Sequence, residues 1–124
     1  MALADEHCAP VTRRSTAVGA DERAPLFAEI HDWQSVTRDG VERLERVFKF
    51  ADFARALAFT NRVGAQADAE DHHPALLTEW GKVTVTWWTH VVDGLHRNDF
   101  VMAARTERIF AQSADPKDRT SGTS

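Results

Sequence analysis

The sequence of 124 residues contains a single cysteine, Cys8, and no long apolar run. One cysteine cannot form a disulfide within the chain, and by itself it cannot build a thiolate metal site. No apolar stretch approaches the roughly 20 residues that a helix needs to cross a bilayer. The first residues show no basic region followed by an apolar one, as a secretory signal would. We therefore expect a protein of the reducing cytoplasm that has no covalent cross-links and does not bind membranes.

Positive charge is not in excess either. Lys and Arg number 15 against 19 Asp and Glu, so the formal net charge is −4. A surface that binds nucleic acid needs clustered Lys and Arg, and we expect no such partner. The hydrophobic content of 43% and the charged content of 27% are typical of a globular protein. The length fits one domain with a modest core, for which self-association is one way to bury more apolar surface.

Composition separates both ends of the chain from its middle. Residues 1–20 have no apolar period and are expected to form a flexible leader, and residues 113–124 a disordered polar tail. Residues 21–112 then make a single domain. Its elements are predicted in the order helix, strand, strand, helix, strand, strand, helix, at 21–32, 33–36, 41–50, about 16 residues after 52, 76–80, 83–90 and from 98 or 99 onward.

Local signals place the turns and caps of these elements. Asp39-Gly40 is a strong hairpin signal, and Asp52 can cap the second helix. Arg46 interrupts the apolar alternation of its strand, so we expect it near an edge or paired. Because hairpins make antiparallel pairs and amphipathic helices cover one sheet face, the pattern predicts an α+β fold with two layers. The apolar stripe predicted for the second helix comprises Phe53, Ala56, Leu57, Thr60, Val63, Gly64 and Ala67.

Titratable and aromatic side chains are concentrated between Asp71 and Asp99. This stretch holds four of the six histidines and three of the four tryptophans. The unperturbed pKa of histidine is about 6.5, so a pocket with several of them is a candidate for proton transfer or metal binding. Trp80, Trp87 and Trp88 could form a flat wall for a planar substrate, although we expect ordinary packing to occupy at least two of them.

Several kinds of site compete for this stretch. His72-His73-Pro74 could be a solvated turn, and three histidines with nearby acids could hold a metal ion. The metal alternative is the weaker, because adjacent histidines rarely bind one ion and the H-E-x-x-H spacing does not occur. Neither a G-x-S-x-G frame nor a Gly-rich nucleotide loop is present. Proton transfer needs a base and an acid near working pH, which two histidines in different environments can supply.

Several short motifs follow one another in this stretch, namely Asp71-His72-His73-Pro74, Trp80-Gly81-Lys82-Val83, Thr89-His90, Gly94-Leu95 and Asp99. This ordered set resembles the pterin-4a-carbinolamine dehydratase family. The resemblance extends upstream through Trp33, 46–50 and 52–53 to Phe59, and it covers about residues 22–110. The residues from Leu77 to His90 and from Gly94 to Phe100 are similar to the bacterial branch associated with phenylalanine hydroxylase.

The resemblance implies a fold and a reaction. The fold is a four-stranded antiparallel sheet with three helices on one face, in agreement with the pattern above. The reaction is the dehydration of 4a-hydroxytetrahydropterin to quinonoid dihydropterin, which recycles the cofactor of an aromatic amino acid hydroxylase. The pterin is then the substrate, and neither a metal nor another cofactor is expected. The family further implies a homo-oligomer, a dimer or a tetramer. The alternative function is a non-catalytic interaction module, either a dimerisation cofactor or an assembly chaperone.

Residue roles are implied by position in the family's motif. The catalytic set is His72, His73 and His90, in which we expect His73 and His90 to be the acid and base pair and His72 to orient or bind the pterin. Asp99 is implied to hold either a nearby histidine or a pterin nitrogen, and Asp68 stands where the family usually carries Glu. The substrate-binding residues implied in this way are Trp33, Asp68, Asp71, Trp88, Thr89 and Asp99.

Overall fold

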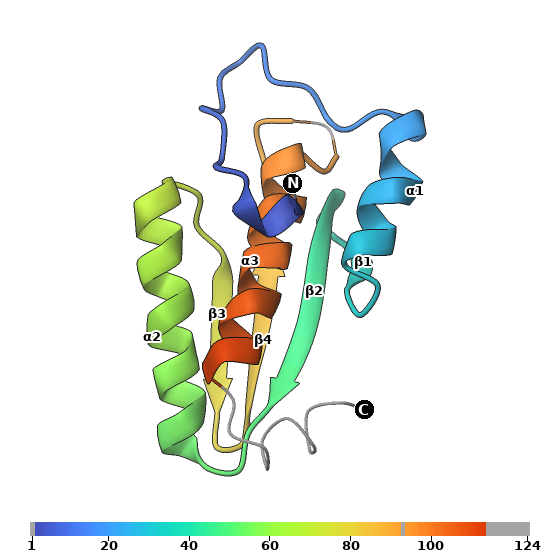
Figure 1. The fold of residues 1–124 in the computed structure, drawn as a ribbon. Coiled ribbons are helices and arrows are strands. Elements are labelled where there is room, and N and C mark those ends of the chain that lie inside the picture. The colour runs from blue at the N-terminus through green and yellow to red at the C-terminus, as the bar shows by residue number, and fades with distance from the viewer. Residues whose placement is uncertain (1, 93, 114–124) are drawn as a thin grey trace.

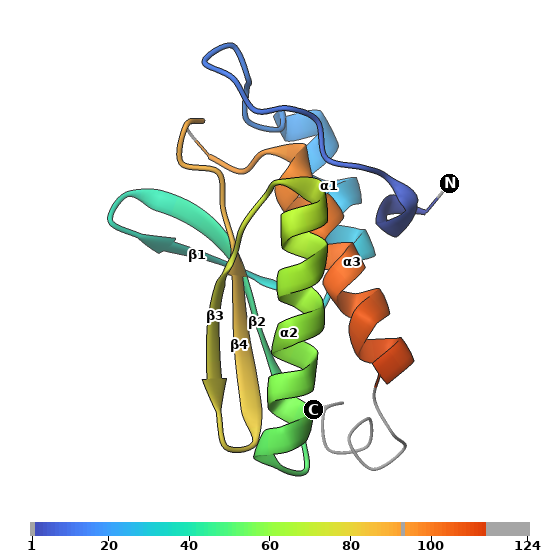
Figure 2. The ribbon, with the colours of Figure 1, turned by 90° about the vertical axis from the view of Figure 1, so that its left-hand side faces the viewer.

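A computed structural model describes residues 2–92 and 94–113. Four strands form one antiparallel sheet in the spatial order β1-β2-β4-β3, with bounds β1 (Gln34–Arg38), β2 (Val41–Lys49), β3 (Ala75–Glu79) and β4 (Lys82–Trp87). Three helices, α1 (Ala20–Glu29), α2 (Phe53–Glu70) and α3 (Arg97–Ser113), lie on one face of this sheet (Figures 1 and 2). The predicted α+β fold and the order of its elements are therefore confirmed.

Both hairpins follow from short turns. Asp39 and Gly40 have φ angles of 54° and 75°, the left-handed values that a two-residue hairpin turn requires. They leave Arg38 paired with Val41 and set the register of β1 on β2. In the second hairpin Glu79 pairs with Lys82, which places Trp80 and Gly81 in the turn. The Asp-Gly signal in the sequence therefore marked its turn correctly.

The core forms where the alternating residues of β2 and β4 meet the helices. Leu44 and Phe48 of β2 and Val83 and Val85 of β4 are fully buried, as their spacing predicted. Arg46 shares their side of the sheet and pairs with Glu107 of α3, while its guanidinium stacks on the Phe48 ring at 4.4 Å. The expectation that Arg46 is paired is therefore confirmed.

Helix α2 begins as predicted, and its buried stripe agrees in part with the predicted one. The Asp52 carboxylate accepts a 2.9 Å hydrogen bond from the Arg55 amide and so caps the helix. Phe53 and Leu57, which the predicted stripe included, remain exposed. The buried residues of α2 are Ala56, Phe59, Val63 and Ala67. The prediction was therefore correct for Ala56, Val63 and Ala67 and missed Phe59, because the buried side of the helix is centred slightly toward Phe59 from the predicted one.

Helix α2 ends at a sharp reversal that leads to the histidine pair. Asp71 has φ 51° and ψ 43°, a left-handed conformation that closes many helices. The amide of His72 then donates to the carbonyl of Ala67 at 3.1 Å. Strand β4 ends at Trp87, earlier than predicted, and the chain continues through Thr89 and His90 without strand pairing. Both segments consequently arrive at the same end of the sheet.

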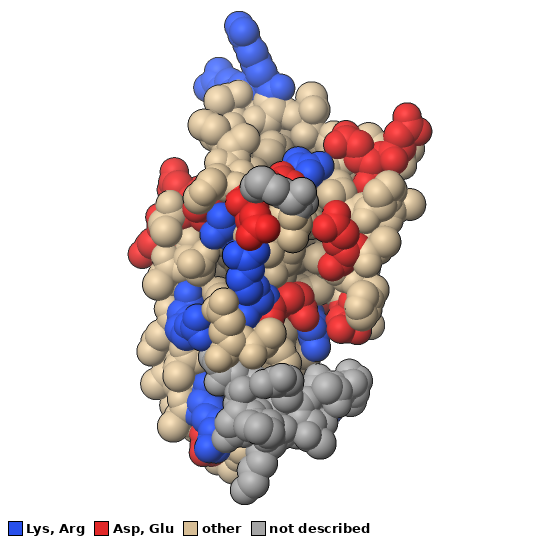
Figure 3. All heavy atoms as spheres, viewed as in Figure 1, with Lys and Arg blue, Asp and Glu red and all other residues tan. Residues whose placement is uncertain are grey.

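Residues 2–19 contact the body of the domain. Leu3 lies in a short 3-10 turn, Leu3–Asp5, and joins the core, being only 2% exposed. The chain lies across α3 and passes over the end of the molecule to α1 (Figure 1). On the face drawn in Figure 3, acidic and basic side chains alternate over α3. The sequence expectation of a flexible leader over 1–20 anticipated none of these contacts, and the expected tail beyond residue 113 lies outside the described residues.

No helix within 2–92 or 94–113 is both long and apolar enough to span a membrane.

Candidate active site

A cavity of about 500 Å³ opens where the end of α2 approaches the end of β4. Three segments line it: the N-terminal segment, the connection between α2 and β3, and the residues after β4. The lining residues are Val11, Asp71, His72, His73, Pro74, Trp88, Thr89, His90 and Val91. The structure therefore brings the His72-His73 pair and His90 to one cavity, although 17 positions of sequence separate His73 from His90.

His72 is the buried member of the set. Its Nε2 lies 2.7 Å from Oδ1 of Asp99, and its ring stacks on Trp87 with 6° between the planes. An ionised carboxylate only accepts hydrogen bonds, so Nε2 of His72 carries the proton that it donates to Asp99. The other ring nitrogen, Nδ1, is then the acceptor that a neutral His72 can offer to a ligand.

Asp99 is fully buried and is held by two further donors. The Thr89 hydroxyl lies 2.9 Å and 3.0 Å from the two carboxylate oxygens, and the backbone amide of His96 donates to Oδ2 at 3.0 Å. Burying a carboxylate is tolerated when hydrogen bonds satisfy it, and here three groups do so. Asp99 does not line the cavity itself, but it positions two residues that do, His72 and Thr89.

His96 extends this network by one residue. Its Nδ1 accepts a 2.9 Å hydrogen bond from the amide of Asn98, in the first turn of α3. Burial lowers the pKa of His96 below the ordinary value, and the nearby Asp99 carboxylate opposes this only in part. The neutral imidazole is the form that can accept from Asn98, so pKa and geometry agree.

His73 and His90 are the solvent-facing members. His73 Nε2 lies 2.9 Å from Oδ1 of Asp68, which sits on the last turn of α2, and both side chains are largely exposed. His90 lies just beyond β4, and within the described residues no hydrogen bond or ion pair restrains its imidazole. Two imidazoles in different surroundings therefore face the cavity, one held by a carboxylate and one free to move.

The tryptophans take three different positions. Trp88 lines the cavity, and the Arg43 guanidinium from β2 lies over its ring at 4.4 Å. Trp87 packs in the core, and Trp80 lies in the β3–β4 turn with 71% of its surface exposed. Of these three, only Trp88 can provide a flat wall. The expectation of ordinary packing is met by Trp87, whereas Trp80 is exposed.

Trp33 lies apart from these residues. It is buried between strand and helix, packs edge-on against Phe48, and donates from Nε1 to Glu107 at 2.9 Å. It is not among the residues that line the cavity, so its substrate-binding role stays a prediction from resemblance.

Six of the nine predicted site residues line the cavity, and Asp68 and Asp99 contact histidines that do.

Two residues near the site had no signal in the sequence. Val11 lines the cavity but belongs to the segment expected to be a flexible leader. His96 was noticed as part of a histidine-rich stretch, without a role. Within the described residues, no group of three or more His, Cys, Asp or Glu side chains is arranged to hold a metal ion.

The geometry can be compared with known families. A sequence model described as pterin 4 alpha carbinolamine dehydratase matches residues 16–109, which is most of the chain. The chain belongs to this family. The match covers α1, the sheet, α2, most of α3 and every histidine of the cavity.

Individual relatives agree. A protein of Microcystis aeruginosa is 54% identical over 110 residues, which is 89% of this chain and 95% of the relative. One of Chlorobium limicola is 59% identical over 99 residues, 80% of this chain and 88% of the relative. Both are provisionally named pterin-4-alpha-carbinolamine dehydratase, which supports the same enzyme class for this chain.

Solved structures share the fold. The crystal structure of a transcriptional coactivator/pterin dehydratase from Brucella melitensis superposes with a TM-score of 0.67 at 32% identity, over 75% of this chain and 97% of that one. A pterin dehydratase-like protein identified as a RuBisCO assembly factor in the alpha-carboxysome gives a TM-score of 0.54 at 21% identity, over 64% and 89% of the two chains. At that identity the second likeness shows the fold alone.

Proposed function

We propose that this protein is a dehydratase that converts 4a-hydroxytetrahydropterin to quinonoid dihydropterin and water. Family membership supports the reaction class. The observation that carries the proposal is that His73 and His90, from separate segments, line the same cavity as His72, whose ring is anchored to Asp99. General acid–base chemistry requires this kind of arrangement, with two titratable groups around one reacting centre.

The reaction breaks two bonds. The N5–H bond gives its proton to a base, and its electron pair forms the double bond between N5 and C4a. The C4a–O bond breaks at the same centre, and the departing hydroxyl leaves as water after it takes a proton from an acid. No electrons are gained or lost overall, so the chemistry requires no electron carrier.

The three histidines divide this task. Of His73 and His90, one accepts the N5 proton and the other protonates the leaving hydroxyl, and each such transfer contributes roughly 10²–10⁴-fold in rate. His72, fixed by Asp99, offers Nδ1 to orient the pterin ring. Trp88 supplies a flat apolar wall for the bicyclic ring.

The direct test is a stopped-flow assay that follows the decay of 4a-hydroxytetrahydropterin with and without the protein. We expect the decay to accelerate in proportion to protein concentration and to slow in variants that lack His73 or His90. A decay rate that equals the spontaneous one at micromolar protein would contradict the proposal. In the cell, the reaction would recycle the cofactor of an aromatic amino acid hydroxylase.

The uncovered face of the sheet supports a second proposal, which concerns self-association. Leu77 of β3 and Val47 of β2 both pair with Thr84 of β4, and they are 58% and 43% exposed on the side away from the helices. Exposed apolar residues in register are typical of a surface that meets another protein. We propose that this face supports a homo-oligomer, a dimer or tetramer.

The same face could instead bind a different partner. The 32% identical structure described as a transcriptional coactivator/pterin dehydratase makes a non-catalytic interaction module the alternative function. A stoichiometric partner in a pull-down, together with no activity on the 4a-hydroxypterin, would favour that alternative over catalysis.

A further inference from the structure

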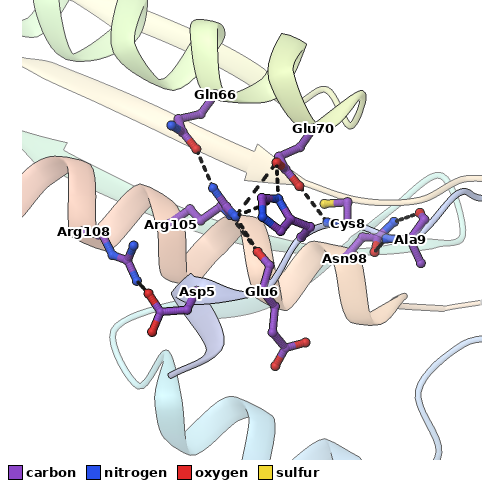
Figure 4. A network of polar contacts seen from close by, with 10 residues as sticks. Asp5, Glu6, Cys8, Ala9, Gln66, Glu70, Asn98, Arg105 and Arg108 are labelled. Atoms are coloured by element: carbon purple, nitrogen blue, oxygen red, sulfur yellow. Dashed lines mark hydrogen bonds and ion pairs between the residues drawn. The ribbon is translucent and has the colours of Figure 1, made fainter. Parts of the chain in front are cut away.

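The N-terminal segment from Asp5 to Val11, called here the strap, joins the two elements that carry the buried part of the site. Figure 4 shows it running between the end of α2 and the face of α3, with polar contacts to both. No role for this segment was predicted from the sequence, and the family model begins only after it, at residue 16. Its contacts therefore need an explanation of their own.

On the α2 side the strap binds Glu70. The Cys8 amide donates to Oε1 of Glu70 at 2.7 Å, and His7 Nδ1 lies 2.9 Å from Oε2. Arg105 of α3 approaches the same carboxylate at 3.9 Å, and only 9% of the Glu70 side chain is exposed. Burial alone would raise the pKa of Glu70, but the hydrogen bond from Cys8 and the groups of His7 and Arg105 outweigh it and lower the pKa.

On the α3 side the strap binds Asn98. The Ala9 amide donates to Oδ1 of Asn98 at 2.9 Å, and Nδ2 of Asn98 donates back to the Ala9 carbonyl at 2.8 Å. Asn98 is 3% exposed, so this reciprocal pair satisfies an amide that is out of contact with water. Ion pairs of Arg97 with Glu6 and of Arg108 with Asp5 hold the strap further along α3.

These anchors lie next to the buried pair of the cavity. Glu70 stands two residues before His72, and Asn98 stands one residue before Asp99. The consecutive strap residues Cys8 and Ala9 thus link the same two elements that the 2.7 Å contact between His72 and Asp99 links directly. The strap then continues to Val11, which forms part of the cavity wall.

We propose that Glu70 and Asn98 are positioning residues, which through the strap fix the distance between the end of α2 and the start of α3 and thereby hold His72 on Asp99. The role in catalysis rests on the proposed dehydratase function, whereas the effect on His72 does not. Among the described residues, hydrogen bonds hold the His72 ring only at Nε2. A shift of α2 or α3 therefore changes the direction in which Nδ1 points. A displacement of about 1 Å in a catalytic geometry can lower a rate by roughly 10²-fold.

A backbone substitution tests the strap without altering either anchor. Ala9→Pro removes the amide that donates to Asn98, whereas Ala9→Ser keeps it and serves as the matched control. Cys8 is the only thiol of the chain, and burial, with help from Glu70, raises its pKa to about 12. The rate of thiol labelling of the folded full-length protein therefore reports release of the strap directly.

Two further readouts separate positioning from simple stability. The first is the NMR signal of the proton on Nε2 of His72, assigned by its absence in His72→Asn. The second is kcat and KM for the 4a-hydroxypterin, measured well below the melting temperature of each variant. We expect Ala9→Pro and Asn98→Ala to speed labelling, to shift or broaden the His72 signal, and to lower kcat by about tenfold or more, while Ala9→Ser matches the wild type.

Side-chain variants complete the test. Glu70→Ala should act like Ala9→Pro, and combining it with Asn98→Ala should produce less than the sum of the two effects, because both act through one strap. Glu79→Gln, an exposed acid on β3, is the control. Faster labelling with an unchanged His72 signal would overturn the proposal, and so would unchanged labelling in Ala9→Pro. If the wild type had no dehydratase activity, the proposed function would fail while the His72 signal still decided the role of the strap.

Discussion

Nε2 of His72 and Oδ1 of Asp99 lie 2.7 Å apart in a buried contact that joins the end of α2 to the first turn of α3. Asp99→Asn keeps the shape of this side chain but replaces one acceptor by a donor. In the wild type, Thr89 and the His96 amide are among the groups that donate to Asp99, and in the variant one of these donors would lose its acceptor. A buried polar group left unsatisfied costs about 1–3 kcal/mol, so we expect the free energy of unfolding in urea to fall by that amount.

The exposed Asp68 gives the control for that experiment. Asp68→Asn also removes a carboxylate from a histidine, but both partners are open to solvent. Its effect on the free energy of unfolding should stay within about 0.5 kcal/mol. Equal losses in the two variants would show that the burial of Asp99 has no energetic consequence.

The two histidines that face the cavity should each be needed for catalysis. We expect His73→Asn and His90→Asn to lower kcat by at least about 10²-fold, the usual contribution of one proton-transfer group. Single-turnover decay of 4a-hydroxytetrahydropterin measures this. His31→Asn, which changes an exposed histidine at the end of α1, is the matched control and should retain wild-type kcat. Full activity in both cavity variants would exclude them as acid and base.

Stability should depend on pH through His96. Its pKa is lowered by burial, so the unfolded chain takes up a proton near the ordinary value of 6.5 while the folded protein does not. Stability from this residue is complete above about pH 6.5 and is lost as the pH falls through the lower folded pKa. Urea unfolding between about pH 7.5 and pH 5.5 should show this loss in the wild type.

His96→Asn removes the titration but can still accept a hydrogen bond from the Asn98 amide at the start of α3. Its free energy of unfolding should therefore change less over the same pH range. Parallel curves for the wild type and His96→Asn would mean that another group is responsible.

The Arg43 guanidinium should matter for substrate binding through Trp88. It stacks on the Trp88 ring at 4.4 Å, an interaction typically of about 0.5–1 kcal/mol when partly exposed. Arg43→Met removes the stacking that restrains the Trp88 ring against which the pterin would pack. We therefore expect KM to rise about two- to fivefold with little change in kcat. Arg38→Met, on the neighbouring strand and paired with Glu45, is the control. A fall in kcat at unchanged KM would contradict a role in binding.

The exposed row on the sheet should be needed for self-association. Leu77→Glu places a charge on the uncovered face, on the edge strand β3 and in register with Val47 across Thr84 of β4. We expect the sedimentation coefficient to fall from that of an oligomer to that of a monomer. Asn61→Glu, on an exposed position of α2, tests whether any added charge has the same effect. A wild-type protein that sediments as a monomer would reject the oligomer itself.

The parts of the fold that the sequence predicted are those with a local cause. Asp39-Gly40 made a left-handed turn because those residues adopt it readily, and Leu44 and Phe48 became core because a strand alternates its faces. The position of the histidines in one cavity was expected from family motifs. Those motifs do not show that Asp99 is sealed behind His72, which depends on packing between α2 and α3.

The N-terminal contacts had no such cause. Cys8 and Ala9 bind their partners with backbone amides, which every residue except proline possesses, so no pattern of side chains marks them. Polar composition alone suggested a flexible segment, and composition does not record which buried acceptors elsewhere in the chain need a donor. The stripe of α2 was predicted too wide, since Phe53 and Leu57 fit the period but remain exposed at the edge of the buried side.

The left-handed backbone of Asp71 turns the chain out of α2 directly before the two neighbouring histidines. Outside glycine, asparagine and aspartate, residues resist this conformation by roughly 1–2 kcal/mol. The conformation of this one residue thus sets the direction in which the chain leaves the helix toward a buried ring, His72, and an exposed one, His73. Glycine, asparagine and aspartate should accordingly be favoured at this position, whichever side chain would suit a ligand best.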